Sequence, residues 1–171
     1  MAANFPELQK KKLVNLFFEP STRTQYSFAI AASRLGMCVI NFNTAHSSLQ
    51  KRETLLDTVN CFVDLGTDLI VVRSKQEQYY NQLTEVKTAI INGGDGTGSH
   101  PTQVLLDLVT IFEQFHRFHD LKALIVGDIR HSRVAKSHYK TLKRLGVMVD
   151  VADPTEFSEP GLNNISTPMN S

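Results

Sequence analysis

The stretch LVNLFFEPSTRTQYSFAIAASRLG, residues 13–36, carries the pattern that decides the fold. Its first part, Leu13–Phe18, is an apolar run that predicts a strand, and the later run Asp68–Val72 is nearly continuous, as in a parallel strand covered on both faces. From Thr24 to Leu35 the apolar side chains instead recur at helical spacing, and Gly36 ends the predicted helix. A strand that leads through a short polar loop into a helix is the first half of a βαβ unit.

The same alternation of strands and helices repeats along the chain. Strands are expected at Met37–Phe42, Asp68–Val72, Thr88–Ile91, Ala123–Val126 and Val147–Val151, and helices at Glu53–Leu65, Gln76–Glu85, Pro101–Phe115 and Arg133–Leu145. The sequence therefore predicts an α/β fold, an open parallel sheet with helices on both faces, in three layers. We expect an N-terminal extension over 1–12, one domain over 13–152, and a linker or disordered tail over 153–171.

The composition of the 171 residues excludes several classes of protein. Hydrophobic residues make up 42% and charged residues 20%, which excludes a largely disordered or collagenous chain. The net charge of +1 gives no reason to expect nucleic acid or a membrane as partner. The start lacks the pattern of a secretory signal, so a cytoplasmic location is expected. Cys38 and Cys61 lie in apolar runs without metal-type spacing and are predicted to be buried thiols.

Cationic residues follow the ends of the predicted strands, where an open parallel sheet binds its ligands. In Ser21–Thr24, backbone N–H groups, a helix dipole, three hydroxyls and one guanidinium would converge as an anion cradle. On these four residues alone, an ordinary N-cap with a surface arginine is the stronger alternative. The other cations at strand ends favour a site for a multiply charged anion; they are Lys51, Arg52, Arg73, His100, Arg130 and Arg133.

Other chemistries receive less support from the sequence. The glycine-rich stretch Gly93–Gly98 lacks the Lys-Ser/Thr of a P-loop, and Ser99 occupies the last glycine position of the dinucleotide motif. We interpret it as a turn that lets the backbone approach a small ligand and presents His100. His116 and His119 lack the further ligands that a metal site needs, so no metal is predicted. No Ser/His/Asp or Cys/His nucleophile arrangement is evident.

Four motifs, in order, give the chain a resemblance to a known family. They are FFEPSTRT (17–24), SLQKRET (48–54), DGTGSHPTQVLLDL (95–108) and GDIRHSRV (127–134). Together they resemble the aspartate carbamoyltransferases, within the wider aspartate/ornithine carbamoyltransferase superfamily, over about residues 16–154. Thr102 within the His-Pro-Thr-Gln motif, and the loop that carries Ser48 and Lys51, favour the aspartate branch over the ornithine branch.

The resemblance implies a function for the chain. Residues 13–152 would form the carbamoyl-phosphate-binding domain of an enzyme that transfers the carbamoyl group from carbamoyl phosphate to the amine of L-aspartate. The products would be N-carbamoyl-L-aspartate and phosphate, in pyrimidine biosynthesis. No metal or organic cofactor is implied.

The resemblance also implies a role for each matching residue. Carbamoyl phosphate would be bound by Ser21, Thr22, Arg23, Thr24, Arg73, His100 and Gln103. Among these, Thr24, Arg73 and His100 would be catalytic because they polarise the carbamoyl carbonyl, and Gln103 would bond the amide. Lys51 and Arg133 would bind aspartate. Ser48 and Lys51 would belong to an interfacial loop that reaches a neighbouring subunit's site in a homotrimer.

The chain also departs from the family pattern. Gln25, Arg52 and the pair Ser74-Lys75 stand where arginine, glycine and His-Pro are usual. We expect the family's aspartate-binding domain to be absent. The chain alone should then show little or no turnover, because Lys51 and Arg133 alone would not fix aspartate for attack, and a misplacement of about 1 Å can lower the rate about a hundredfold. Two alternatives stay open: a non-catalytic domain that binds carbamoyl phosphate or another small anion, and an ornithine carbamoyltransferase-like protein.

Overall fold

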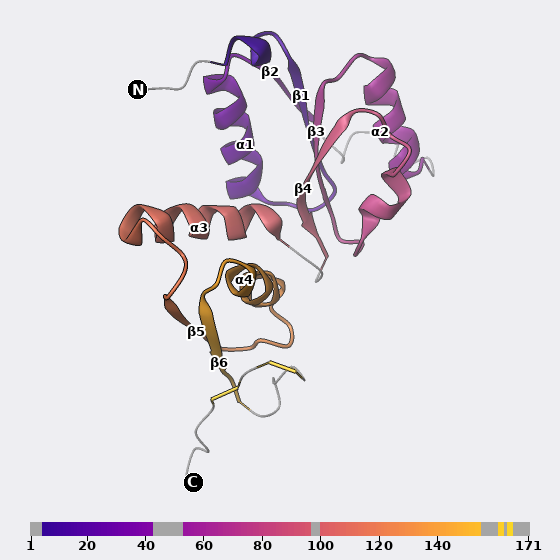
Figure 1. The fold of residues 1–171 in the computed structure, drawn as a ribbon. Coiled ribbons are helices and arrows are strands. Elements are labelled where there is room, and N and C mark those ends of the chain that lie inside the picture. The colour runs from indigo at the N-terminus through magenta and orange to yellow at the C-terminus, as the bar shows by residue number, and fades with distance from the viewer. Residues whose placement is uncertain (1–4, 43–52, 97–99, 155–160, 163, 166–171) are drawn as a thin grey trace. The chain divides into compact units, whose positions relative to one another are not determined.

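The structure is a computed structural model that describes residues 5–42, 53–96, 100–154, 161–162 and 164–165 (Figure 1). It divides into two compact units, Met1–Gly96 and Thr97–Ser171.

The first unit is built on four parallel strands. Its elements are a 3₁₀ turn at Pro6–Leu8, β1 (Lys12–Phe17), α1 (Thr22–Arg34), β2 (Cys38–Phe42), α2 (Leu55–Asp64), β3 (Leu69–Ser74), the 3₁₀ helix η4 (Tyr79–Leu83) and β4 (Ala89–Asp95). The strands lie in the order β2-β1-β3-β4, and every neighbouring pair is parallel. The predicted parallel α/β fold is therefore confirmed.

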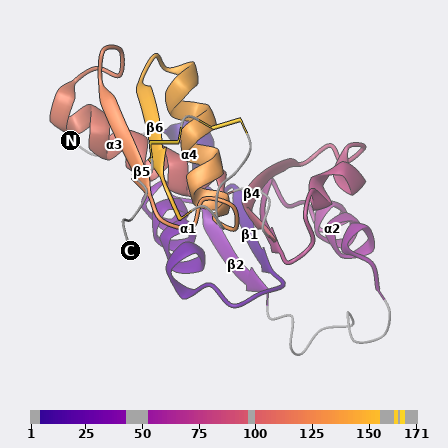
Figure 2. The same ribbon diagram turned by 90° about the horizontal axis from the view of Figure 1, so that it is seen from below.

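Helices cover both faces of this four-stranded sheet, with α1 and α2 on opposite sides (Figures 1 and 2). On one face, Leu13 and Phe17 of β1 pack with Ala32 of α1. On the other face, Val14 of β1 packs with Val59 of α2. Because β1 and β3 are buried on both faces, they lose the alternation of a half-exposed strand, and this unit has the three layers predicted.

Helices α1 and η4 are among the elements of the first unit whose bounds differ from prediction. Helix α1 begins at Thr22, so the threonines and arginine of the predicted cradle belong to its first turn. The helix expected at Gln76–Glu85 is only the short η4, because Gln78 takes a left-handed conformation (φ 53°) directly before it. Buried Tyr79 then donates its hydroxyl to the Val72 carbonyl at 2.8 Å, which ties η4 to the sheet.

The second unit contains α3 (Pro101–Phe115), β5 (Lys122–Val126), α4 (Arg133–Arg144) and β6 (Met148–Ala152). Strands β5 and β6 form a separate two-stranded parallel sheet. Its core joins Ala135 and Leu142 of α4 to Val149 of β6, with Leu108 of α3 packed against them. The sequence predicted one domain and one sheet over 13–152, whereas the described strands pair as two sheets. The apolar pattern locates strands but does not say which strands are neighbours.

The cysteine prediction is wrong, because both Cys38 and Cys61 are exposed. Cys38 opens β2, which is an edge strand of its sheet. Much of the predicted tail lies outside the described residues, but Ile165 donates its N–H to the carbonyl of Val151 in β6 at 2.8 Å. Among the helices of the described residues, none is long and apolar enough to cross a membrane.

Candidate functional site

The N-terminus of α1 presents unpaired donors at the end of the first strand. The first backbone bond of this helix runs from the Gln25 N–H to the Ser21 carbonyl at 3.0 Å, so the N–H groups of Thr22 to Thr24 precede it. The Ser21 hydroxyl does not cap the helix; it bonds the Thr24 hydroxyl at 3.0 Å. No acidic residue lies in the first turn to offset the helix dipole. The helix dipole and these N–H groups therefore favour an anion at this point. The alternative, an ordinary N-cap, would need a hydrogen bond to the Ser21 side chain that the structure does not contain.

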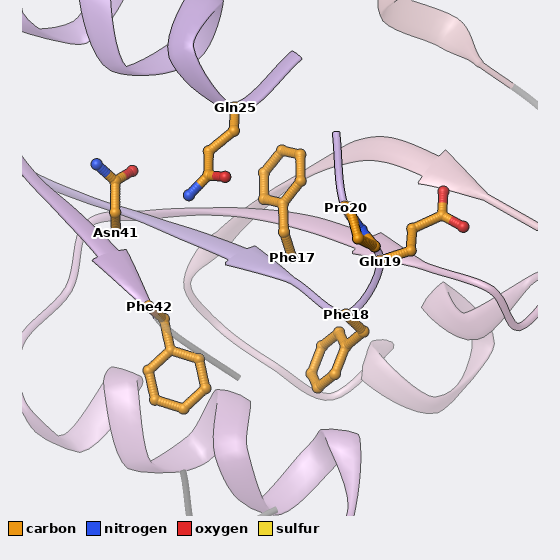
Figure 3. A pocket seen from close by; sticks show the side chains of 7 residues that line it. All are labelled: Phe17, Phe18, Glu19, Pro20, Gln25, Asn41 and Phe42. Carbon is orange, nitrogen blue, oxygen red and sulfur yellow. The ribbon is translucent and has the colours of Figure 1, made fainter. Parts of the chain in front are cut away.

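A cavity of about 390 Å³ lies beside this helix end. Its lining residues are Phe17, Phe18, Glu19, Pro20, Gln25, Asn41 and Phe42 (Figure 3). Figure 3 shows Gln25 and Asn41 on the same side of β1 as Phe17, with Phe18 and Phe42 directed to the opposite side. Gln25, one of the departures from the family pattern, is thus part of the wall of the cavity.

Asn15, which is fully buried in β1, fixes the helix end against the sheet. Its Nδ2 donates to Asn41 Oδ1 of β2 at 2.8 Å and to the Gln25 carbonyl of α1 at 3.3 Å. A buried amide with both partners resists displacement because breaking either bond leaves a desolvated polar group. Neither Asn15 nor Asn41 is among the residues predicted for the site, although a polar residue inside the apolar run of 13–18 is a signal in the sequence.

Arg73 lies at the end of β3, next to the end of β1, where it is in register with Phe17. The residue is 8% exposed. Its Nη1 donates to the Gly93 carbonyl at 3.1 Å, and its Nε lies 2.6 Å from Glu19 Oε1. The guanidinium is therefore held at the carboxyl edge of the sheet by a carboxylate that the sequence analysis did not select.

A β-bulge makes room for this arginine. Val72 pairs with Asn92 and Ser74 with Asp95, so Gly93 and Gly94 together stand opposite Arg73. Gly94 has φ +135°, and a Cβ on it would lie 3.0 Å from Arg73 Nη1. The glycines that the sequence analysis assigned to a turn approaching a ligand belong partly to β4, where they accommodate Arg73.

Three further predicted site residues lie in the second unit, each near the start of a helix. His100 is the N-cap of α3, and Gln103 lies in its first turn, where Nε2 donates to Asp107 Oδ1 at 3.2 Å. Arg133 begins α4, whose N-cap Ser132 accepts the Ala135 N–H at 3.1 Å. The residues predicted for the site are thus distributed over the two units. Ser48, Lys51 and Arg52 lie outside the described residues.

The loop before α4 also holds a carboxylate with a displaced pKa. The backbone N–H of His131 donates to Asp128 Oδ1 at 3.0 Å, and this bond is the largest cause that lowers the pKa of Asp128. The His131 ring lies 3.0 Å from the same carboxylate. Within the described part of the chain, no group of three His, Cys, Asp or Glu residues is arranged to hold a metal ion.

Comparison with known proteins identifies relatives of the chain. Residues 2–113 match the family described as aspartate/ornithine carbamoyltransferase, carbamoyl-P binding domain. The chain is 50% identical over 152 residues to the aspartate carbamoyltransferase catalytic subunit of Malacoplasma penetrans, covering 89% of the chain and 51% of that protein. It is 52% identical over 155 residues to the same subunit of Enterococcus faecalis, with 89% and 50% covered.

A solved structure gives the same assignment. The aspartate transcarbamoylase of Trypanosoma cruzi, in complex with carbamoyl phosphate and aspartate, superposes with a TM-score of 0.82 at 34% identity, covering 90% of this chain and 52% of that one. The chain thus spans about half the length of the relatives that it matches.

Proposed function

Since this chain belongs to the aspartate/ornithine carbamoyltransferase family, we propose that it binds carbamoyl phosphate and supplies that site for carbamoyl transfer to L-aspartate. The observation that carries the proposal is the pairing of the uncapped N-terminus of α1 with Arg73, which the next strand holds at the same edge of the sheet. Both lie within the residues that match the family's carbamoyl-phosphate-binding domain. The relative from Trypanosoma cruzi binds carbamoyl phosphate and aspartate.

In this proposal the phosphate lies at the start of α1, bound by Ser21 to Thr24 through backbone N–H groups, hydroxyls and the Arg23 guanidinium. Arg73 also contacts the phosphate. Thr24, Arg73 and His100 donate to the carbamoyl carbonyl oxygen, and the Gln103 side chain bonds the carbamoyl amide.

The transfer needs no nucleophile from the protein. The amine nitrogen of aspartate attacks the carbamoyl carbon and forms the new C–N bond. The bond between that carbon and the bridging phosphate oxygen breaks, phosphate leaves with the electron pair, and the proton lost by the amine goes to the leaving phosphate. Negative charge grows on the carbonyl oxygen and on the leaving phosphate, so fixed cations and N–H donors lower the barrier. Holding the two anionic substrates together removes much of the entropic cost.

Binding of aspartate and assembly belong to the same proposal. Lys51 and Arg133 would bind aspartate, and Ser48 with Lys51 would reach a neighbouring site in a homotrimer. The cytoplasmic location stays a prediction. The carbamoyl-phosphate-binding domain is proposed to span 13–152, and the family match over residues 2–113 supports its N-terminal part.

Calorimetry on the 171-residue chain, with carbamoyl phosphate and with inorganic phosphate, tests the anion site. Arg23→Ala should weaken binding of both roughly 10- to 150-fold, because a charge-assisted hydrogen bond is worth about 1.5–3 kcal/mol. Arg34→Ala is the matched control, since Arg34 is an exposed arginine in the last turn of the same helix. Unchanged affinity in Arg23→Ala, or an equal loss in Arg34→Ala, would refute the cradle.

A narrower function, anion binding without transfer, is the alternative that a turnover assay tests. We expect little or no carbamoyl-aspartate from the purified chain with both substrates. Measurable turnover by this chain would exclude the narrower function. The ornithine alternative is tested by offering both amines to a chimera that carries a complete second domain.

A further inference from the structure

A series of polar contacts runs from Gln103 through Asp107 to His138 and joins α3 to α4 within the second unit. Asp107 accepts the Gln103 Nε2 on one carboxylate oxygen at 3.2 Å, one helical turn further along α3. Its other oxygen, Oδ2, lies 2.5 Å from Nε2 of His138 on α4. The other ring nitrogen of His138, Nδ1, lies 2.7 Å from the Val134 carbonyl.

We propose that Asp107 and His138 are positioning residues that orient the Gln103 carboxamide toward the carbamoyl amide of the substrate. This inference rests on the proposed function. A carboxylate only accepts hydrogen bonds, so the end of Gln103 that faces Asp107 must be its NH₂ group. The carboxamide oxygen is then left to accept. A carbamoyl NH₂ group offers only donors, so an amide held in this orientation matches it and a flipped amide does not.

The two ring nitrogens of His138 face two different acceptors. Nδ1 faces a carbonyl and must carry a proton to bond it. Nε2 faces a carboxylate, so the contact is attractive only when Nε2 carries a proton as well. The His138 side chain is 13% exposed and that of Asp107 42%, so the imidazole is the more rigidly packed partner. Asp128 is the other carboxylate that lines the cavity of about 490 Å³ shared by Asp107 and His138.

The binding test compares carbamoyl phosphate with inorganic phosphate, which lacks the amide. In Asp107→Leu the affinity for carbamoyl phosphate should fall about tenfold while that for phosphate stays unchanged. Asp107→Asn should retain the preference, because its oxygen can accept from Gln103 while its NH₂ group donates to a neutral His138. Glu113→Leu, on the same helix, is the matched control for losing an acidic residue. An equal loss for both ligands, or no loss, overturns the inference.

NMR supplies a second readout that a merely structural contact would not move. His138→Leu changes neither Gln103 nor Asp107, so the side-chain NH₂ signals of Gln103 should shift in this variant only if His138 acts through Asp107. Glu113→Leu should leave these signals in place. Unchanged Gln103 signals together with an unchanged preference for carbamoyl phosphate in His138→Leu overturn the inference. A wild-type chain that binds neither ligand overturns the proposed function itself.

Discussion

Replacing Glu19 with glutamine should lower the free energy of unfolding of the ligand-free chain and raise its affinity for phosphate. In the structure, Glu19 Oε1 lies 2.6 Å from Arg73 Nε, so the Glu19 carboxylate forms an ion pair with the guanidinium that the proposed ligand would also contact. An anion that reaches Arg73 must compete with this carboxylate. Glu19→Gln removes the competing charge but keeps the size of the side chain and an oxygen that can still accept.

The magnitude follows from the burial of the pair. The Arg73 side chain is 9% exposed and that of Glu19 17%. A hydrogen bond to a charged group contributes about 1.5–3 kcal/mol, and breaking a fully buried ion pair costs about 3–5 kcal/mol. Because Glu19 keeps some exposure and glutamine keeps an acceptor, we expect a loss of about 2 kcal/mol in the free energy of unfolding. Phosphate should bind about tenfold more tightly, which corresponds to about 1.4 kcal/mol.

Urea denaturation with and without phosphate, together with calorimetry, measures both effects. Saturating phosphate should recover part of the lost stability, because a ligand that binds only the folded state stabilises it. Asp68→Asn is the matched control: it breaks the Lys11–Asp68 pair, at 2.8 Å, in the same unit but at an exposed position. It should leave phosphate affinity unchanged. Unaltered stability in Glu19→Gln, or weaker phosphate binding, would show that Glu19 does not compete for Arg73.

Two further predictions concern the β-bulge and the dependence of stability on acid pH. Gly94→Ala should destabilise the chain by about 1–3 kcal/mol and weaken phosphate binding, since the added Cβ would lie 3.0 Å from Arg73 Nη1. Gly127→Ala is the control: Gly127 has φ +128° and nothing within 4 Å of the added Cβ, so this variant should show backbone strain alone, and equal phosphate affinities in the two variants would contradict the role of Gly94. The hydrogen bond from the Lys11 side chain is the main cause that lowers the pKa of Asp68 below 3.8, so its stabilisation is complete above that pH and is lost as pH falls through the folded-state pKa. Urea midpoints measured from neutral to acid pH should decline less in Asp68→Asn, and parallel curves would argue against the assignment.

The sequence predicted most of the elements because their signals are local. Apolar runs locate the strands and the 3.6-residue period locates the helices, whatever the rest of the chain does. The prediction for α3, Pro101–Phe115, is confirmed with both ends correct. The helix predicted at Gln76–Glu85 shortened to η4 because one left-handed residue, Gln78, interrupts it, and a single backbone angle leaves no trace in a pattern of hydrophobicity.

The residues of the candidate site could be recognised in the sequence only in part, for the same reason. Ser21 to Thr24 were identifiable because a helix N-terminus is built from consecutive residues. Glu19 belongs to the same motif, but its ion pair is with Arg73, 54 positions later, and depends on the register of β1 beside β3. Pairing across strands is set by the sheet, and no spacing along the chain encodes it.

By itself, the sequence determined the parallel α/β class, the order of the elements and the cationic residues at the strand ends, because each of these is written in short stretches of chain. Only the tertiary structure decided that β5 and β6 pair apart from the four-stranded sheet and that a bulge at Gly93 and Gly94 faces Arg73. It also decided that Glu19 forms an ion pair with the Arg73 guanidinium. These are contacts between residues distant in the sequence, and their energies depend on burial and distance, which exist only once the strands have met.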